Sequence, residues 1–156
     1  MGNPNQPVAT AVMLLRRPVE VVYDAFANPE TTTKFWFTKS TGRLEAGKTV
    51  VWSWEMYGVS VPVSVVAAEP GKRIVVSWGE AGAQTEVEWT FRDLGELGTY
   101  VRVVNSGFAG TPEEIVAKVN DAAGGFNLLL AGAKAWLEHG VQLNLVADHV
   151  PEAVRS

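Results

Sequence analysis

The stretch TPEEIVAKVNDAAGGFNLLLAGAKAWLEHG, residues 111–140, decides the fold because it predicts one long helix with clearly marked ends. Thr111 and Glu114 form a capping box, and Pro112 occupies the first helical position, where a missing N–H costs nothing. Gly140 is a natural terminator. Apolar side chains recur between these ends at helical spacing, at Ile115, Val119, Ala122, Phe126, Leu129, Ala133 and Trp136. A helix of about 28 residues, roughly 42 Å long, must cover one face of a sheet.

The chain before this helix alternates between apolar and polar residues, as strands joined by tight turns do. Strands are predicted at residues 41–44, 49–57, 59–68, 73–78, 84–92 and 99–106. Glu69-Pro70-Gly71-Lys72 is a strong turn signal, and the glycines of 95–98 mark another turn. Short connections between consecutive strands indicate an antiparallel meander.

A strand at residues 8–15 and two short helices precede the meander. Pro18 opens the first helix, which runs through Ala27, and Asn28 caps the second, which starts at Pro29 and ends near residues 35–37. The predicted fold class is therefore α+β: a strand, two short helices and six strands form a curved antiparallel sheet wrapped on a long C-terminal helix. Residues 1–156 are expected to form a single domain, with 1–7 as a flexible lead-in and 141–156 as a C-terminal tail.

Composition excludes several classes of protein. The 13 basic and 17 acidic residues are mixed along the chain and give a net charge of −4, so the electrostatic footprint of nucleic-acid binding is missing. The chain has no cysteine, which excludes disulfides and thiolate chemistry. No apolar run approaches the roughly 18 residues of a membrane span, and the N-terminus does not resemble a signal peptide. A cytoplasmic location is the expectation.

Neither a metal nor a cofactor is expected. The two histidines, His139 and His149, lack the spacing of a metal-binding motif, and His139 suits the negative end of the helix dipole. The glycines of 79–82 and 95–98 lie in strand connections rather than ahead of helices. They therefore do not form a phosphate cradle.

Six tryptophans are the most informative side chains of the sheet. Strand parity places Trp52 and Trp54 on one face, and the same face is predicted for Val63, Trp78, Trp89 and Asn105. Core filling would explain these rings without a ligand, whereas indole N–H groups on a concave face favour the wall of a pocket. We expect two or three of the strand tryptophans to contact a cavity, with Trp36 at its lip and Trp136 packing the helix end.

Asn105 and Glu55 are the polar candidates. A buried Asn105 amide needs partners, and both neighbouring groups and an atom of a ligand are open as partners. Glu55 is a weak catalytic candidate, because parity puts it opposite the tryptophans, where a solvated glutamate is the simpler interpretation. Gly125 and Gly132 share a face of the long helix, and each costs about 1 kcal/mol relative to alanine. Close packing and space for a ligand are both open as explanations.

The order of elements and several local phrases resemble the START-like superfamily, also called the SRPBCC, Bet v-type or polyketide-cyclase-like helix-grip fold. The most similar branch is named for the C-terminal domain of the activator of heat-shock protein 90 ATPase. The resemblance rests on residues 18–26, 28–30, 35–36, 98–99, 103–108 and 135–140, and spans roughly residues 8 to 140. In this branch the position of Asn105 is often histidine, so a family role for that imidazole is absent here.

The resemblance implies a cavity between the sheet and the long helix that binds a small hydrophobic, aromatic or lipid-like molecule. The expected lining residues are Trp36, Trp52, Trp54, Val63, Trp78, Trp89, Asn105, Phe126, Leu129, Leu130 and Ala133. An enzyme of the cyclase, hydrolase or lyase type using the same cavity is one alternative, and Glu55 is its only candidate acid or base. A co-chaperone or stress-response interaction domain is the other alternative, and a homodimer and a contact with a chaperone are open as further partners.

Overall fold

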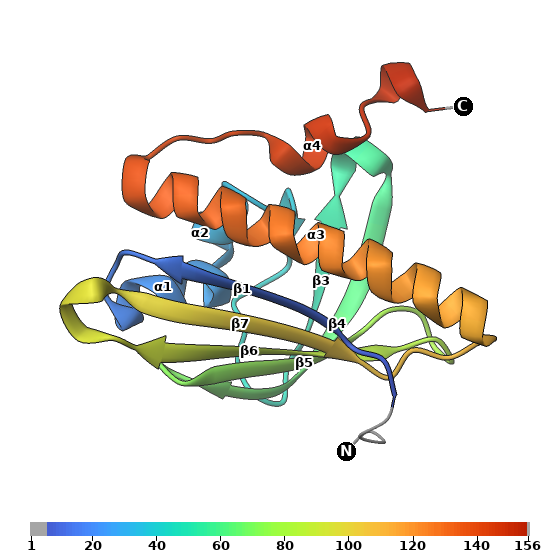
Figure 1. The fold of residues 1–156 in the computed structure, drawn as a ribbon, viewed down its shortest axis with the longest axis horizontal. Helices are drawn as coiled ribbons and strands as arrows, with labels where there is room; N and C mark the ends of the chain where they lie inside the picture. The colour runs from blue at the N-terminus through green and yellow to red at the C-terminus, as the bar shows by residue number, and fades with distance from the viewer. Residues whose placement is uncertain (1–5, 156) are drawn as a thin grey trace.

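One antiparallel sheet of seven strands holds the long C-terminal helix in the computed structural model, which describes residues 6–155 (Figure 1). The strands lie in the order β1-β7-β6-β5-β4-β3-β2, so the six later strands form the predicted meander, and β1 completes the sheet beside β7. The fold class predicted from the sequence is confirmed. Residues 1–5 of the predicted lead-in lie outside the described residues.

The elements follow the predicted order along the chain. The strands are β1 (Ala9–Leu15), β2 (Lys39–Ser40), β3 (Thr49–Trp54), β4 (Val59–Glu69), β5 (Arg73–Trp78), β6 (Thr85–Asp93) and β7 (Thr99–Ser106). The helices are α1 (Val19–Ala27), α2 (Pro29–Thr32), α3 (Pro112–His139) and α4 (Leu145–His149). Three short 3₁₀ turns complete the described chain, η1 (Glu55–Tyr57), η2 (Gly95–Leu97) and η3 (Glu152–Val154).

Helix α3 begins and ends where its local chemistry predicts. The Thr111 hydroxyl accepts a hydrogen bond from the Glu114 N–H, at 3.2 Å, and Gly140 takes a left-handed conformation with φ 65°. The buried side chains of α3 all lie between Phe126 and Leu137, whereas Val116 in the first half is 64% exposed. The second half of α3 therefore supplies the buried side chains of this helix.

The strand predicted at residues 41–44 is wrong. The strand beside β3 is the two-residue β2. The chain then bends, and the Ser40 hydroxyl stabilises the bend by accepting from the Gly42 N–H and donating to the Gly42 carbonyl. Leu44 is apolar because it is buried in the core, and its N–H is satisfied by the Ala27 carbonyl of α1 instead of by a strand. The apolar Leu44 therefore indicated a strand, although the residue is buried without pairing to one.

Two further differences lie near the tail. The strand predicted at residues 49–57 stops at Trp54, because the chain turns through η1 to reach Gly58, whose φ is 63°. The tail contains α4, which the sequence did not predict, and folds back along α3 (Figure 1). The Tyr57 hydroxyl donates to the Val146 carbonyl, which attaches this tail to η1.

Three polar contacts fasten the end of α3 to the end of β1. The Glu138 carboxylate accepts from the Arg16 N–H at 2.8 Å and from the Lys134 ammonium at 2.7 Å. Lys134 also donates to the Leu14 carbonyl, and the Arg17 guanidinium donates to the Leu137 carbonyl. Burial alone would raise the pKa of Glu138, but the hydrogen bonds from Arg16 and Lys134 outweigh it and hold the pKa below its ordinary value of 4.5.

Glu138→Gln is expected to lower the free energy of unfolding by about 1 kcal/mol at neutral pH, because the hydrogen bonds lose their charge assistance. A carboxylate with a lowered folded-state pKa stabilises the fold above its unfolded-state pKa, and this stability is lost as pH falls through the folded-state value. Urea unfolding of both proteins should therefore show a gap at neutral pH that closes in acid, below pH 4.5. A gap that persists unchanged in acid would contradict this assignment.

Candidate functional site

The space between α3 and the sheet is centred on the indole of Trp36, which belongs to the loop of residues 33–38 after α2. The centroid of the Trp36 ring lies 5.0 Å from that of Trp52, 5.6 Å from Trp54, 5.8 Å from Trp78, 5.9 Å from Trp89 and 6.2 Å from Phe126. These neighbours come from β3, β5, β6 and α3. Only 8% of Trp36 is exposed. Trp36, which the sequence placed at the lip of the site, lies with its ring among these five aromatic side chains, and its role in ligand binding stays a prediction.

The side chains predicted to line the site do face the helix. Trp52, Trp54, Val63 and Trp89 are buried on the inner face of the sheet, and Trp78 is half-buried against them. Phe126, Leu129, Leu130 and Ala133 are buried on α3. These residues pack together as one core, so the parity of the strands is confirmed, while their role in ligand binding stays a prediction.

Three hollows share the Trp36 ring as part of their wall. The enclosed hollow, between Trp36 and the sheet, is too small to hold a water molecule; its lining is Phe26, Trp36, Leu44, Trp52, Ile74 and Trp89. The Gly125 hollow is an open depression of about 200 Å³, lined by Trp36, Trp78, Asp121, Ala122, Gly125 and Phe126. The Trp36 indole therefore separates a filled core from open space beside α3.

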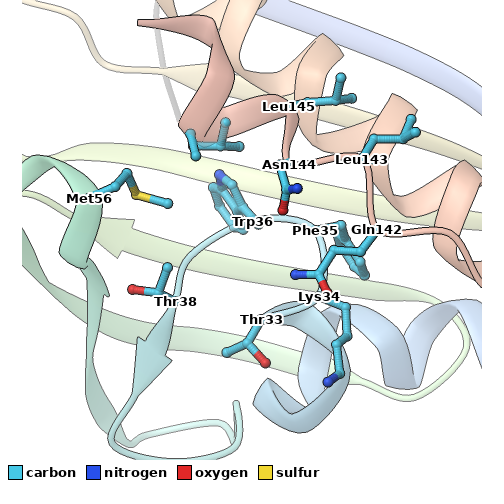
Figure 2. A pocket seen from close by; sticks show the side chains of 13 residues that line it. Thr33, Lys34, Phe35, Trp36, Thr38, Met56, Gln142, Leu143, Asn144 and Leu145 are labelled. Atoms are coloured by element: carbon cyan, nitrogen blue, oxygen red, sulfur yellow. The ribbon is translucent and has the colours of Figure 1, made fainter. Parts of the chain in front are cut away.

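The third hollow, here called the tail hollow, has a volume of about 100 Å³. Its walls are the loop of residues 33–38, Met56 and Gly132, and the tail residues 142–147. Figure 2 shows Trp36 in the middle of this wall, with Met56 and Asn144 on either side. Sequence analysis missed these tail residues, because nothing in their pattern indicates that the tail folds back on the loop.

The indole N–H groups of the wall differ in their partners. Trp78 donates its Nε1–H to the Thr85 hydroxyl at 3.0 Å. Trp52 and Trp89 are buried, and their Nε1 atoms have no hydrogen-bond acceptor among residues 6–155. The indole donor of Trp78 thus has an acceptor within the protein, whereas the indole donors of Trp52 and Trp89 have none among the described residues.

Asn105 is buried, and its amide finds partners within the fold. The Asn105 Nδ2 donates to the Thr85 hydroxyl at 3.0 Å and to the Glu86 carbonyl at 2.8 Å, both on β6. Neighbouring groups and a ligand atom were both open as partners of this amide, and its N–H donors bond neighbouring groups. Asn105 joins β7 to β6 at the edge of the tryptophan wall.

The two glycines of α3 have different explanations. A Cβ on Gly132 would lie 3.1 Å from the Phe35 Cβ and 3.2 Å from the Phe35 carbonyl oxygen, so Gly132 permits close packing of the loop that carries Trp36. A Cβ on Gly125 would meet no atom of a described residue within 4 Å. Gly125 therefore leaves open space beside Trp36, and the neighbouring Gly124 also faces open space.

Titratable groups lie at the margin of the site. Glu55, the weak catalytic candidate, is exposed in η1, and it does not line any of the three hollows. Asp121 borders the Gly125 hollow but is exposed. Its spacing of four residues from Gly125 could have indicated this position. Between residues 6 and 155 no group of three or more His, Asp or Glu side chains could hold a metal ion.

None of the helices in the described part of the chain is long and apolar enough to cross a lipid bilayer.

Solved structures with the same fold come from several bacteria. The protein SSP2350 of Staphylococcus saprophyticus is 28% identical with a TM-score of 0.75, and the match covers 88% of this chain and 96% of that one. The Aha1 dimer of Colwellia psychrerythraea is 18% identical with a TM-score of 0.71, over 86% and 98% of the two chains. DynU16, a putative protein in the dynemicin biosynthetic locus, is 20% identical with a TM-score of 0.76, over 86% and 48%.

No functionally curated protein matches the sequence. The profile of a protein family matches residues 16–138, from the end of β1 to the last turn of α3, and so includes every strand of the meander and the tryptophan wall. The tail residues that line the tail hollow lie beyond this match. The chain belongs to the family of Activator of Hsp90 ATPase homolog 1-like proteins.

Proposed function

We propose that the protein binds a small aromatic or hydrophobic molecule between α3 and the sheet, at the place of the Trp36 indole. The position of Trp36 carries this proposal: a side chain from a loop stands between a packed aromatic wall and open space. A loop side chain can move aside without breaking a strand or a helix. The surrounding wall would remain in place to receive a ligand of similar shape.

The size of the hollows supports displacement of Trp36. Pockets for small molecules commonly measure roughly 300–1,000 Å³. The Gly125 hollow, at about 200 Å³, is smaller than this range, and the tail hollow is smaller still, at about 100 Å³. If the Trp36 ring moved aside, both would join one space bounded by Trp52, Trp78 and Phe126. Aromatic rings favour a flat ligand, since offset and edge-on ring pairs each contribute roughly 0.5–1.5 kcal/mol.

Catalysis is the less supported alternative. A general acid or base must reach the reacting group, and the two carboxylates nearest the site, Glu55 and Asp121, are both exposed. The likeness to DynU16 is a likeness of fold alone at 20% identity. A contact with a chaperone, lipid binding and a homodimer stay proposals for which the hollows give no specific support.

Gly125→Leu is expected to abolish ligand binding, because the new side chain would fill the Gly125 hollow beside Trp36. Gly124→Leu is the matched control: it faces open space, does not line the hollow and gains the same helix propensity of about 1 kcal/mol. Thermal shifts with a panel of small aromatic compounds should identify a ligand of the wild-type protein. The ligand should bind Gly124→Leu normally and Gly125→Leu at least roughly tenfold more weakly.

Two results would contradict the proposal. One is that no compound of the panel raises the melting temperature of the wild-type protein. The other is that the identified ligand binds both leucine variants with the wild-type affinity, which would place its site away from Trp36.

A further inference from the structure

Two buried hydrogen-bond donors in the tryptophan wall lack acceptors. Trp52 and Trp89 are each only 1% exposed, and no described residue accepts a hydrogen bond from either Nε1. Buried polar groups in folded proteins nearly always have a partner, so two unpaired donors in one wall need an explanation. Trp78 shows that the fold can supply an acceptor where one is needed, because its indole bonds the Thr85 hydroxyl.

The enclosed hollow cannot supply the missing acceptors. It is too small to hold a water molecule, so no water inside it can bridge to either indole. Its described lining consists of aromatic and aliphatic side chains. Trp36 fills the centre, but an indole N–H is a donor and has no oxygen or nitrogen lone pair to offer. The Trp36 ring meets those of Trp52 and Trp89 nearly edge-on, at 62° and 65°, and contacts of this kind are weak substitutes for a hydrogen bond.

The two rings that carry the unpaired donors lie close to each other and to the Trp36 ring. The Trp36 centroid is 5.0 Å from that of Trp52 and 5.9 Å from that of Trp89, and the Trp52 and Trp89 centroids are 6.5 Å apart. A flat molecule lying where the Trp36 ring now lies would contact both indoles. An oxygen atom on such a molecule could accept the hydrogen bonds that Trp36 cannot.

We infer that the ligand is a neutral aromatic carbonyl compound, such as an aryl ketone or a quinone, whose oxygen accepts hydrogen bonds from the Trp52 and Trp89 indoles. This inference rests on the proposed function and specifies the chemistry of the same site. The two indole N–H donors require a ligand atom that accepts hydrogen bonds. The described lining of the enclosed hollow carries no charged side chain, so a charged ligand group placed beside the Trp52 and Trp89 rings in this hollow would be buried without a counter-charge. A neutral carbonyl oxygen meets both conditions.

Acetophenone and isopropylbenzene test this inference, because they have nearly the same shape and differ in a carbonyl oxygen against a methyl group. Calorimetric titration of the wild-type protein and of Trp36→Leu, in which space is opened, should show acetophenone binding at least about fivefold tighter, because one net hydrogen bond already gives this factor and the oxygen accepts two. Trp52→Phe and Trp89→Phe keep a ring and remove the N–H, so each should reduce this preference. Trp54→Phe is the control, because the Trp54 Nε1 is not one of the unpaired buried donors.

The indole N–H resonances of the wild-type protein give a second measurement that needs no variant to fold. Acetophenone should move the Trp52 and Trp89 signals in the direction of hydrogen-bond formation, and isopropylbenzene should not. Equal affinities of the two compounds, with these signals unmoved, would overturn the inference and leave the proposed function standing. Failure of both compounds to bind the wild-type protein and Trp36→Leu would overturn this inference, and failure of every compound of the aromatic panel as well would overturn the proposed function.

Discussion

Trp36→Ala is expected to lower the free energy of unfolding by about 3–5 kcal/mol, the usual cost of removing a large buried aromatic side chain. The ring contacts four other tryptophans and Phe126, and none of these neighbours can collapse into the space without leaving its strand or helix. Added indole should therefore enter the vacated space and restore part of the lost stability. Melting temperatures measured with and without indole provide the test.

Trp136→Ala is the control for this rescue. Trp136 also lies on α3, but it is only half-buried where it packs on the core, and the Lys34 ammonium lies 5.7 Å from its ring centroid. Its loss should cost less, and indole should not restore it. Equal responses of the two variants to indole would contradict the central position of Trp36.

Gly98→Ala is expected to destabilise the protein by about 2–5 kcal/mol, through backbone strain and overpacking together. The φ of 127° and ψ of −146° at Gly98 belong to a region essentially restricted to glycine. A Cβ there would lie 2.4 Å from the Leu15 carbonyl oxygen and 2.8 Å from the Arg16 Cα, and neither backbone atom can move freely. The clash would force β1 and β7 apart at the point where the chain leaves β1 for α1.

Gly95→Ala separates this clash from the cost of a positive φ. Gly95 has a φ of 61° and open space around the position of a Cβ, so alanine there should cost only about 1–2 kcal/mol. In urea unfolding, the midpoint of Gly98→Ala should lie at a clearly lower urea concentration than the midpoint of Gly95→Ala. Similar midpoints for both would mean that β1 shifts easily and that Gly98 does not fix its position.

Local chemistry made most of the fold predictable. Thr111 and Gly140 set the ends of α3, because capping depends on residues within one turn. Alternation placed Trp52 and Trp89 on the inner face, because the side-chain period of a strand is fixed at two. The prediction of a strand at residues 41–44 was wrong because an apolar residue in a bend can be as buried as one in a strand, and Leu44 is such a residue.

The site itself was harder to predict than the fold, because a sequence pattern reports burial and not the arrangement that produces it. Parity tells which face a side chain occupies, but not whether the space in front of that face is filled. Here the answer depends on one loop residue, Trp36, which belongs to no periodic pattern and whose neighbour Phe35 packs closely on Gly132. The tail hollow depends on a contact between Tyr57 and Val146, which are far apart in the sequence.

The fluorine spectrum of protein labelled with 5-fluorotryptophan tests most directly whether Trp36 stands in the place of the ligand. The chain carries six tryptophans, and single tryptophan-to-phenylalanine variants would assign their signals. On saturation with acetophenone, the Trp36 signal should move furthest, the Trp52 and Trp89 signals should follow, and the Trp136 signal should stay unchanged. A Trp36 signal that does not move while the compound binds, or a response confined to Trp136, would contradict the proposed site.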